Sequence, residues 1–198
     1  MIKRMLCQRC ERPINVCYCQ NITTLENQWP VYIFQYFKEN KYALGTARIA
    51  KLSLNNCNIF PSNHQEYQKQ LDTLFLQSPL LIFPGKDSIP LTSLSLSKPK
   101  PLIFLDGTWR KTRRLLHESP QLESFVKVSF ETNRLSRYRI RKAPSLFSVS
   151  TLEAIVYVLS YLENEPTKYQ SLLNSMDLMI NKQIEMMGET TFKKNYRD

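Results

Sequence analysis

The sequence predicts an α/β fold, in which a mostly parallel sheet carries helices on both faces. Three observations lead to this prediction. Strand-like apolar segments alternate with segments of helical periodicity along most of the chain. Residues 80–83 and 102–105 are apolar at every position, as is typical of strands covered on both sides. The chain of 198 residues is 42% hydrophobic, which suits one core of ordinary size.

The predicted elements follow one another in a regular order. Strands are predicted at residues 30–36, 58–60, 80–83, 102–105, 126–130 and 138–142. Helices are predicted at residues 43–54, 66–77, 108–117, 150–162 and 169–187. Most of the strands are rich in β-branched and aromatic residues, and the helices repeat apolar residues every three or four positions. Residues 86–100, rich in Ser, Pro and Lys, are predicted to form a loop.

The charge of the chain favours a polyanionic partner. Its 27 basic and 17 acidic residues give a net charge of +10, which suits phosphate contacts with nucleic acid. With only four glycines, the sequence contains neither of the glycine-rich nucleotide loops GxGxxG and GxxxxGK[ST].

The sequence also predicts the compartment. No apolar run reaches the ~18 residues of a transmembrane helix. The N-terminus lacks the apolar run of ~7–15 residues that a secretory signal requires. We therefore expect a cytoplasmic protein with reduced cysteines and no membrane association. The sequence carries no signal for the oligomeric state, for which a monomer is favoured.

Four of the five cysteines lie close together near the N-terminus. Cys7, Cys10, Cys17 and Cys19 form the pattern C-x2-C-x6-C-x-C. Two close pairs separated by a short turn can wrap one tetrahedral zinc ion, and a closed set of four thiolates is usually structural. Chance clustering and redox-active thiols are the alternatives. We predict a zinc-binding segment over residues 1–24, followed by a catalytic domain over residues 25–198.

Two further expectations concern the fifth cysteine and the basic residues of this segment. Cys57, outside the pattern, is expected to be a free buried thiol. The basic residues of the segment can either contact RNA phosphates or form an ordinary solvated face; they are Lys3, Arg4, Arg9 and Arg12.

The central motif places an acid directly after a buried strand. Asp106 follows the strand at 102–105, and Gly107-Thr108-Trp109 opens the next helix. In open α/β sheets, ligands bind beyond the carboxyl ends of the strands, where Asp106 should lie. The alternative is that Asp106 caps the helix.

Two basic stretches follow the central motif. The helix at 108–117 carries Arg110, Lys111, Arg113 and Arg114 on one side. In residues 134–142, alternation predicts that Arg137, Arg139 and Arg141 share one face while Tyr138, Ile140 and Lys142 share the other. Both stretches favour contact with an RNA backbone, and the alternative for the helix is a solvated face.

A capping box begins the next helix. Ser150 and Glu153 have the spacing at which each side chain caps the backbone of the other. Capping alone can explain the pair, although a helix N-terminus also presents N–H groups to an anion such as a carboxylate.

Taken together, these residues resemble the DTW-domain family, whose D-x-T-W motif stands here as Asp106-Gly107-Thr108-Trp109. The other blocks occur in the family order over residues 7 to 162: the four-cysteine pattern, then 43–50, 83–85, 136–144 and 150–154. One block departs from the family. A His-Pro-x-Glu-like sequence is replaced here by Tyr36-Phe37-Lys38-Glu39, which keeps only the acid. The role of that histidine is therefore not carried over to this chain.

The resemblance implies a SPOUT-like fold with a C-terminal trefoil knot. It implies transfer of the 3-amino-3-carboxypropyl group from S-adenosylmethionine to N3 of a uridine in tRNA, with methylthioadenosine as the by-product. A SPOUT-type RNA methyltransferase and a non-catalytic zinc-containing RNA-binding protein are the alternatives.

The site residues that follow from the resemblance and the motif chemistry fall into three groups. The catalytic group is Asp106, Thr108 and Trp109, with Asp106 as the base. The residues expected to bind S-adenosylmethionine are Phe83, Pro84, Gly85, Leu105, Arg141, Ala143, Ser150, Thr151 and Glu153. The residues expected to bind RNA are Arg110, Arg113, Arg114, Arg137 and Arg139, although Arg139 and Arg141 are each alternatives for holding the carboxylate of S-adenosylmethionine.

Overall fold

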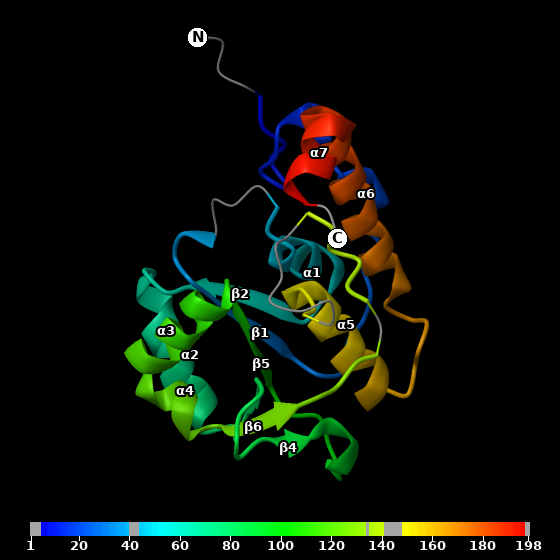
Figure 1. Cartoon of the computed structure of the whole chain (residues 1–198). Coiled ribbons are helices and arrows are strands. Elements are labelled where there is room, and N and C mark those ends of the chain that lie inside the picture. The colour runs from blue at the N-terminus through cyan, green and yellow to red at the C-terminus, as the bar shows by residue number, and fades with distance from the viewer. Residues whose placement is uncertain (1–4, 40–43, 134, 141–147, 197–198) are drawn as a thin grey trace.

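The computed structural model describes residues 5–39, 44–133, 135–140 and 148–196. In these residues, six parallel strands form one sheet in the order β2-β1-β5-β3-β6-β4 (Figure 1). The strands are β1 Val31–Gln35, β2 Cys57–Pro61, β3 Leu80–Ile82, β4 Ile89–Pro90, β5 Leu102–Asp106 and β6 Val126–Ser129. The predicted α/β class and parallel sheet are therefore confirmed.

The register of the central strands brings polar residues together at one edge. Every residue of β5 is buried, as its apolar run predicts. Strand β1 pairs with β5 in parallel, so that Val31 lies beside Leu102 and Gln35 lies beside Asp106. Two polar side chains consequently end neighbouring strands at the carboxyl edge of the sheet.

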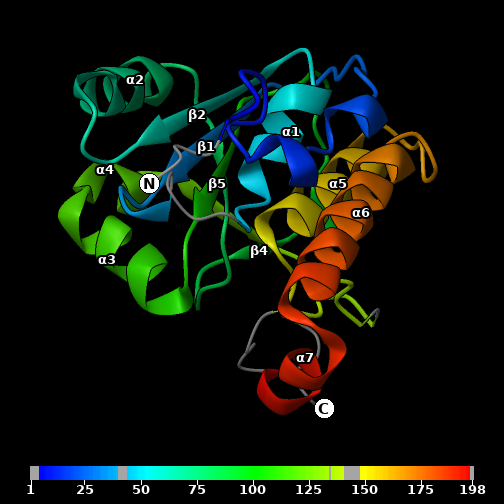
Figure 2. The ribbon, with the colours of Figure 1, turned by 90° about the horizontal axis from the view of Figure 1, so that it is seen from above.

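Helices cover the sheet on both faces. Figures 1 and 2 show α2 Gln65–Phe75, α3 Trp109–Glu118 and α4 Pro120–Ser124 on one side. The other side carries α1 Ala47–Ser53, α5 Thr151–Leu162 and α6 Gln170–Met187, followed by α7 Glu189–Asn195. This arrangement divides the core into two hydrophobic clusters, one on each face.

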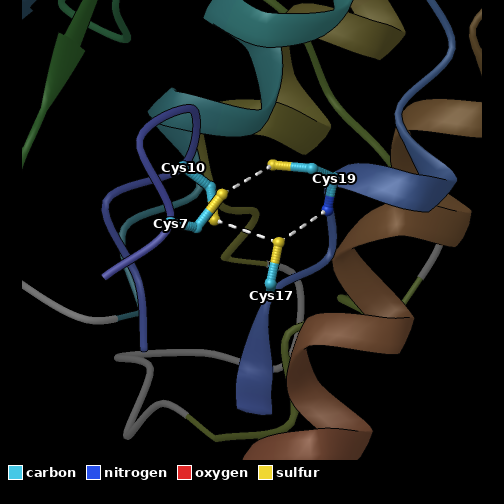
Figure 3. Close-up of side chains that lie close together, drawn as sticks. All are labelled: Cys7, Cys10, Cys17 and Cys19. Carbon is cyan, nitrogen blue, oxygen red and sulfur yellow. Dashed lines mark hydrogen bonds between the residues drawn. The ribbon is translucent and has the colours of Figure 1, made fainter. Parts of the chain in front are cut away.

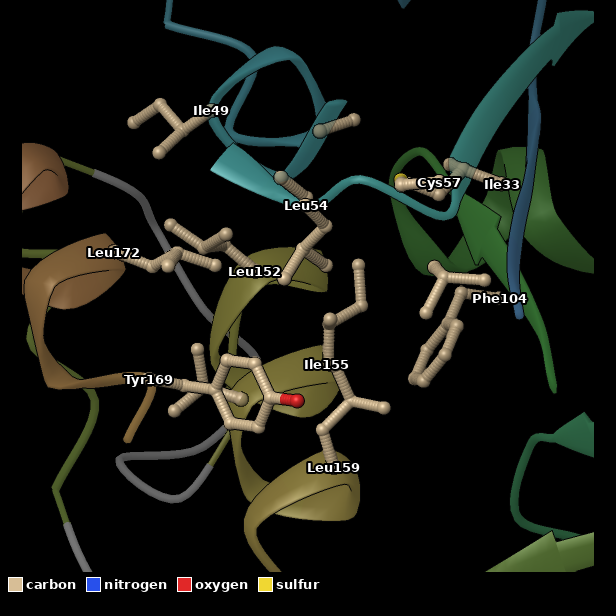
Figure 4. Packing of buried hydrophobic residues seen from close by; sticks show 14 of the residues in the cluster. Ile33, Ile49, Leu54, Cys57, Phe104, Leu152, Ile155, Leu159, Tyr169 and Leu172 are labelled. Atoms are coloured by element: carbon tan, nitrogen blue, oxygen red, sulfur yellow. The ribbon is translucent and has the colours of Figure 1, made fainter. Parts of the chain in front are cut away.

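Alternation along the strands assigns side chains to the two clusters. Leu102 and Phe104 of β5 belong to the larger cluster, under α1, α5 and α6, whereas Ile103 and Leu105 belong to the smaller one. Figure 4 shows the larger cluster, in which Ile155 of α5 lies near Phe104. The start of α5 therefore packs against the C-terminal part of β5.

Most predicted elements are confirmed to within a few residues, and the differences have physical reasons. The predicted loop at 86–100 contains β4, whose Pro90 is tolerated because β4 is an edge strand. A 3-10 turn, Leu91–Ser93, follows it. Helices α4 and α7 were not predicted, since each is short and lacks a long apolar repeat.

The strand predicted at 138–142 is wrong for its described part. Residues 138–140 form a turn instead of pairing with the sheet. The predicted alternation is nevertheless present, because Tyr138 and Ile140 are buried while Arg139 is exposed. Packing produces the pattern: the Tyr138 hydroxyl donates to the Leu44 carbonyl at 2.8 Å. Arg141 and Lys142 lie outside the described residues.

The N-terminal segment packs on the same core as the sheet. Cys10 and Tyr18 belong to the larger hydrophobic cluster. Two 3-10 turns, Ile14–Val16 and Cys19–Asn21, carry the chain towards β1. The division at residue 24 and the C-terminal knot both stay predictions. Among the described residues, each helix is too short or too polar to cross a lipid bilayer.

Candidate active site

A cavity of about 510 Å³ opens where β3, β5 and β6 end and α3 and α5 begin. This is the edge at which parallel sheets bind ligands. Its wall includes five of the residues expected to bind S-adenosylmethionine: Phe83, Pro84, Leu105, Ser150 and Thr151. It also includes Trp109, whose ring meets that of Phe83 edge-on, with 5.7 Å between the ring centroids.

Other predicted site residues lie elsewhere. Gly85 is exposed beyond the wall and packs near Lys127. Thr108 is exposed and is the N-cap residue of α3. Glu153 faces away from the cavity, where its carboxylate accepts hydrogen bonds from the backbone N–H groups of Ser150 and Arg137. Arg141 and Ala143 lie outside the described residues.

Asp106 is held at the end of β5 by donors from two other elements. Its side chain is 7% exposed. The carboxamide of Gln35 donates to Oδ2 at 2.7 Å, and the hydroxyl of Thr151 donates to Oδ1 at 2.5 Å. The carboxylate therefore joins β1, β5 and α5 at a single point. Two donors to a carboxylate stabilise its charged form.

The turn after Asp106 explains the glycine of the motif. Gly107 has φ of +155°, and a Cβ atom there would lie 3.1 Å from Cβ of Lys111. A side chain at this position would be strained by the backbone conformation and would crowd the first turn of α3. The N-cap of α3 is Thr108, so the alternative that Asp106 caps this helix is wrong.

The capping box at the start of α5 is confirmed. The Ser150 hydroxyl accepts from the Glu153 backbone N–H, and the Glu153 carboxylate accepts from the Ser150 backbone N–H at 2.7 Å. This cap leaves Thr151, the first residue of α5, facing both the cavity and Asp106.

Three predicted RNA-binding arginines lie on the outer side of α3. Arg110 and Arg113 are exposed, and Arg114 forms an ion pair with Glu118 at 2.6 Å. Lys111 forms an ion pair with Glu39, the one residue that this chain keeps of the family's His-Pro-x-Glu-like sequence. This pair ties the segment after β1 to α3, beside the Gly107 turn.

The other two predicted RNA-binding arginines contact α6. Arg137 forms an ion pair with Asp177, and Arg139 donates to the Asn181 side chain at 2.6 Å. Asp177 and Asn181 are four residues apart and share one face of the helix. These contacts give both arginines a structural role, in addition to any contact with RNA.

The four N-terminal cysteines converge in the described structure (Figure 3). Their Sγ atoms all lie within 4.8 Å of one another, and Cys7–Cys19 and Cys10–Cys17 are each 3.7 Å apart. A tetrahedron of sulfurs ~2.3 Å from zinc has edges of about 3.8 Å, so the geometry fits the ion. Backbone hydrogen bonds from Cys10 and Arg9 lower the pKa of the Cys7 thiol to about 6, whereas burial raises the pKa of the Cys10 and Cys19 thiols.

The cysteine loop, residues 7–19, packs against α6. The Lys182 ammonium donates to the Cys17 carbonyl at 2.6 Å. The Arg12 guanidinium lies against Sδ of Met179 at 3.0 Å and over the Tyr18 ring. With only 7% of its surface exposed, Arg12 is not available for the predicted RNA contact, whereas Arg9 is exposed.

Sequence reasoning missed Gln35 as a site residue. A glutamine at the end of an otherwise apolar strand was the available signal. Its significance depends on the pairing of β1 with β5, which places it beside Asp106. The contact between Thr151 and Asp106 was missed for the same reason, because 45 residues separate them in the chain.

Comparison with known proteins agrees with the resemblance in the sequence. The family model of the DTW domain matches residues 4–184. The chain is similar to tRNA-uridine aminocarboxypropyltransferase 2 of Drosophila melanogaster, with 30% identity over 92% of this chain and 76% of the relative. The mouse protein of the same name is 26% identical over 98% of this chain and 68% of its own length.

A plant relative extends the comparison. tRNA-uridine aminocarboxypropyltransferase A of Arabidopsis thaliana is 23% identical over 88% of this chain and 78% of its own length. No solved structure matches the chain.

Proposed function

The chain belongs to the DTW-domain family, and we propose that it transfers the 3-amino-3-carboxypropyl group of S-adenosylmethionine to N3 of a uridine in tRNA. One observation carries the proposal. The D-x-T-W turn forms part of a cavity wall at the carboxyl edge of the sheet, and the chain matches a tRNA-uridine aminocarboxypropyltransferase over most of its length. Methylthioadenosine is the by-product of this reaction.

The cavity suits S-adenosylmethionine in size and in character. Its volume of about 510 Å³ lies within the ~300–1,000 Å³ that is usual for small-molecule sites. Phe83, Pro84 and Leu105 offer an apolar surface for the adenosine. The first turn of α5, which begins at Thr151, offers backbone N–H groups for the carboxylate of the methionine arm.

Orientation of the donor decides which group is transferred. The sulfonium has three carbons that a nucleophile can attack, and this reaction requires the methylene of the methionine arm. A carboxylate held near the α5 N-terminus would anchor that arm, while the apolar wall holds the adenosine. Positioning of this kind is the main catalytic contribution to a displacement between two bound substrates.

The acceptor nitrogen needs a base. Uridine N3 carries a proton and is a poor nucleophile until it begins to lose it. Asp106 is the base that we propose, because hydrogen bonds from Gln35 and from Thr151, a residue of the cavity wall, fix its carboxylate next to the cavity. Trp109 and Thr108 would then shape the adjoining edge of the site.

We further propose that tRNA approaches over α3. Arg110 and Arg113 present positive charge beside the cavity, and the whole chain carries +10. Arg114, Arg137 and Arg139 are further candidates for phosphate contacts. The cysteines are proposed to hold one structural zinc in a segment over residues 1–24, and the enzyme is proposed to act in the cytoplasm.

The by-product and the tRNA test this function directly. Incubation with tRNA and S-adenosylmethionine should yield methylthioadenosine and 3-(3-amino-3-carboxypropyl)uridine in the digested tRNA. S-adenosylhomocysteine would indicate a methyltransferase instead, and absence of both products would contradict the proposal. Mass spectrometry of tRNA nucleosides from a deletion strain would identify the modified position.

A further inference from the structure

The proposed base does not itself line the cavity. The cavity wall includes its chain neighbours Leu105 and Gly107 and its hydrogen-bond partner Thr151, whereas Asp106 itself is only 7% exposed. A uridine inside the cavity therefore meets other atoms before it meets the carboxylate. This separation raises the question of how the N3 proton would reach Asp106.

Thr151 occupies the position between the cavity and the carboxylate. It lines the cavity, and its hydroxyl donates its proton to Oδ1 of Asp106 at 2.5 Å. A hydroxyl oxygen that donates in one direction still has lone pairs with which to accept from another. The residue is the first of α5, and the Ser150–Glu153 cap fixes its backbone.

Gln35 completes the arrangement from the opposite side. Its carboxamide donates to Oδ2 of Asp106 at 2.7 Å, so that Oδ1 is the oxygen turned towards Thr151. Gln35 is buried and belongs to β1, which is paired in register with β5. The rigid centre of the sheet thus holds the carboxylate in one orientation.

We propose that the hydroxyl of Thr151 relays the proton of uridine N3 to Asp106. This role rests on the proposed function, and it makes Thr151 the catalytic residue that touches the acceptor base. Gln35 is then a positioning residue, which acts through Asp106.

The relay balances in protons and electrons. The N3 lone pair forms a bond to the methylene carbon of the methionine arm, and the bond from that carbon to sulfur breaks. Sulfur keeps the electron pair and leaves in methylthioadenosine. The N3 proton passes to Oγ1 of Thr151 while the hydroxyl proton of Thr151 passes to Oδ1 of Asp106, which becomes neutral.

Substitution of Thr151 tests the relay. Thr151→Val keeps the shape and removes the hydroxyl, so the single-turnover rate at neutral pH should fall on the order of 10²-fold or more. The dissociation constants of S-adenosylmethionine and tRNA should stay unchanged, because valine keeps the backbone N–H with which the start of α5 would hold the donor carboxylate. Thr151→Ser retains a hydroxyl and should retain most of the rate. A comparable loss in Thr151→Ser and Thr151→Val would overturn the relay.

A double variant separates the relay from direct catalysis by Asp106. If both residues act in one proton path, Thr151→Val combined with Asp106→Asn should be no slower than Asp106→Asn alone. A normal rate in Thr151→Val with a slow Asp106→Asn would overturn the relay and leave Asp106 as a direct base. Failure of the wild-type enzyme to form the modified uridine would instead contradict the proposed function.

The number of moving protons gives an independent readout. Single-turnover rates in mixtures of H2O and D2O should follow a curved dependence, because two protons move together. A linear dependence would mean that one proton moves, and it would overturn the relay. Thr73→Val is the matched control: Thr73 also lies on a helix, but its hydroxyl donates to the Lys69 carbonyl, and α2 contributes no residue to the described cavity wall. Its rate should equal that of the wild type.

Discussion

Asp106 is the single residue on which the chemistry depends most. Asp106→Asn should lower the single-turnover rate on the order of 10²-fold or more while both substrates still bind. The amide keeps one oxygen acceptor, and the Gln35 carboxamide can turn to accept from its nitrogen, so the local packing should survive. Partial recovery at high pH is expected because uridine N3 then ionises without a base. A near-normal rate at neutral pH would remove Asp106 from the mechanism.

Gln35 donates a hydrogen bond to the Asp106 carboxylate, which makes it the residue through which the ionisation of Asp106 can be tested. Gln35→Glu would place a second carboxyl group 2.7 Å from Oδ2, and two carboxyls this close share a proton. The pKa of the pair rises, so the basic form is lost at a higher pH than in the wild type. The acidic limb of the pH–rate profile should therefore move towards alkaline pH, and the rate at neutral pH should fall.

A matched variant on the surface checks this interpretation. Gln121 also donates to an aspartate, Asp72, at 3.2 Å, but the pair is exposed on the far helices. Gln121→Glu should leave the pH–rate profile unchanged. If the profile of Gln35→Glu were as unchanged as that of the control, Gln35 would have no positioning role.

At the scale of elements, the cysteine loop anchors α6. Cys10→Ser should lower the zinc content and the thermal stability, because structural zinc contributes ~10 kcal/mol or more to small sites. Loss of the zinc site should also weaken the contacts of Arg137 and Arg139, because their partners lie on the same helix as Lys182, which bonds to Cys17. Metal analysis and thermal melting measure both effects.

The remaining cysteine supplies the control for the zinc site. Cys57 is buried and lies outside the cluster of four thiols. Cys57→Ala should therefore retain all the zinc. Stoichiometric zinc in a Cys10/Cys17 double variant would contradict the four-thiolate site.

Helix α3 is the element that we expect to contact the RNA backbone. Arg110→Gln combined with Arg113→Gln should weaken tRNA binding and reduce the salt slope of log K by roughly 2, since each lost phosphate contact contributes ~0.9. Binding of S-adenosylmethionine should not change. The control removes the same charge from α7, with Lys193→Gln and Lys194→Gln. An equal salt slope in the α3 variant and the wild type would assign the RNA contact elsewhere.

For the whole molecule, the cavity joins parts of the fold that are distant in the chain. Its wall draws on the ends of β3, β5 and β6 and on the start of α5, so a ligand there binds the folded state alone. S-adenosylmethionine at about 100 times its Kd should stabilise the protein by ~2.7 kcal/mol, which raises Tm by roughly 5–10 °C for a domain of this size. Asp106→Asn should show the same rise. No rise in thermal melting would mean that the folded protein does not bind S-adenosylmethionine.

The sequence by itself determined the parallel sheet, the capping box at Ser150 and the convergence of the four cysteines. Each is a local feature: an apolar run, a three-residue spacing and two close pairs of ligands carry the information within a short segment. The position of Asp106 at the carboxyl edge followed from the same kind of evidence, since it directly follows a buried strand.

Only the tertiary structure decided how these local features combine. The pairing of β1 with β5 places Gln35 beside Asp106, and packing of α5 on the sheet brings Thr151 to the same carboxylate. Tertiary packing also makes the segment around Tyr138 a turn and not a strand, with Tyr138 bonded to the Leu44 carbonyl and Arg139 bonded to Asn181 of α6. Strand order and helix packing depend on contacts between residues far apart in the chain, which no local pattern encodes.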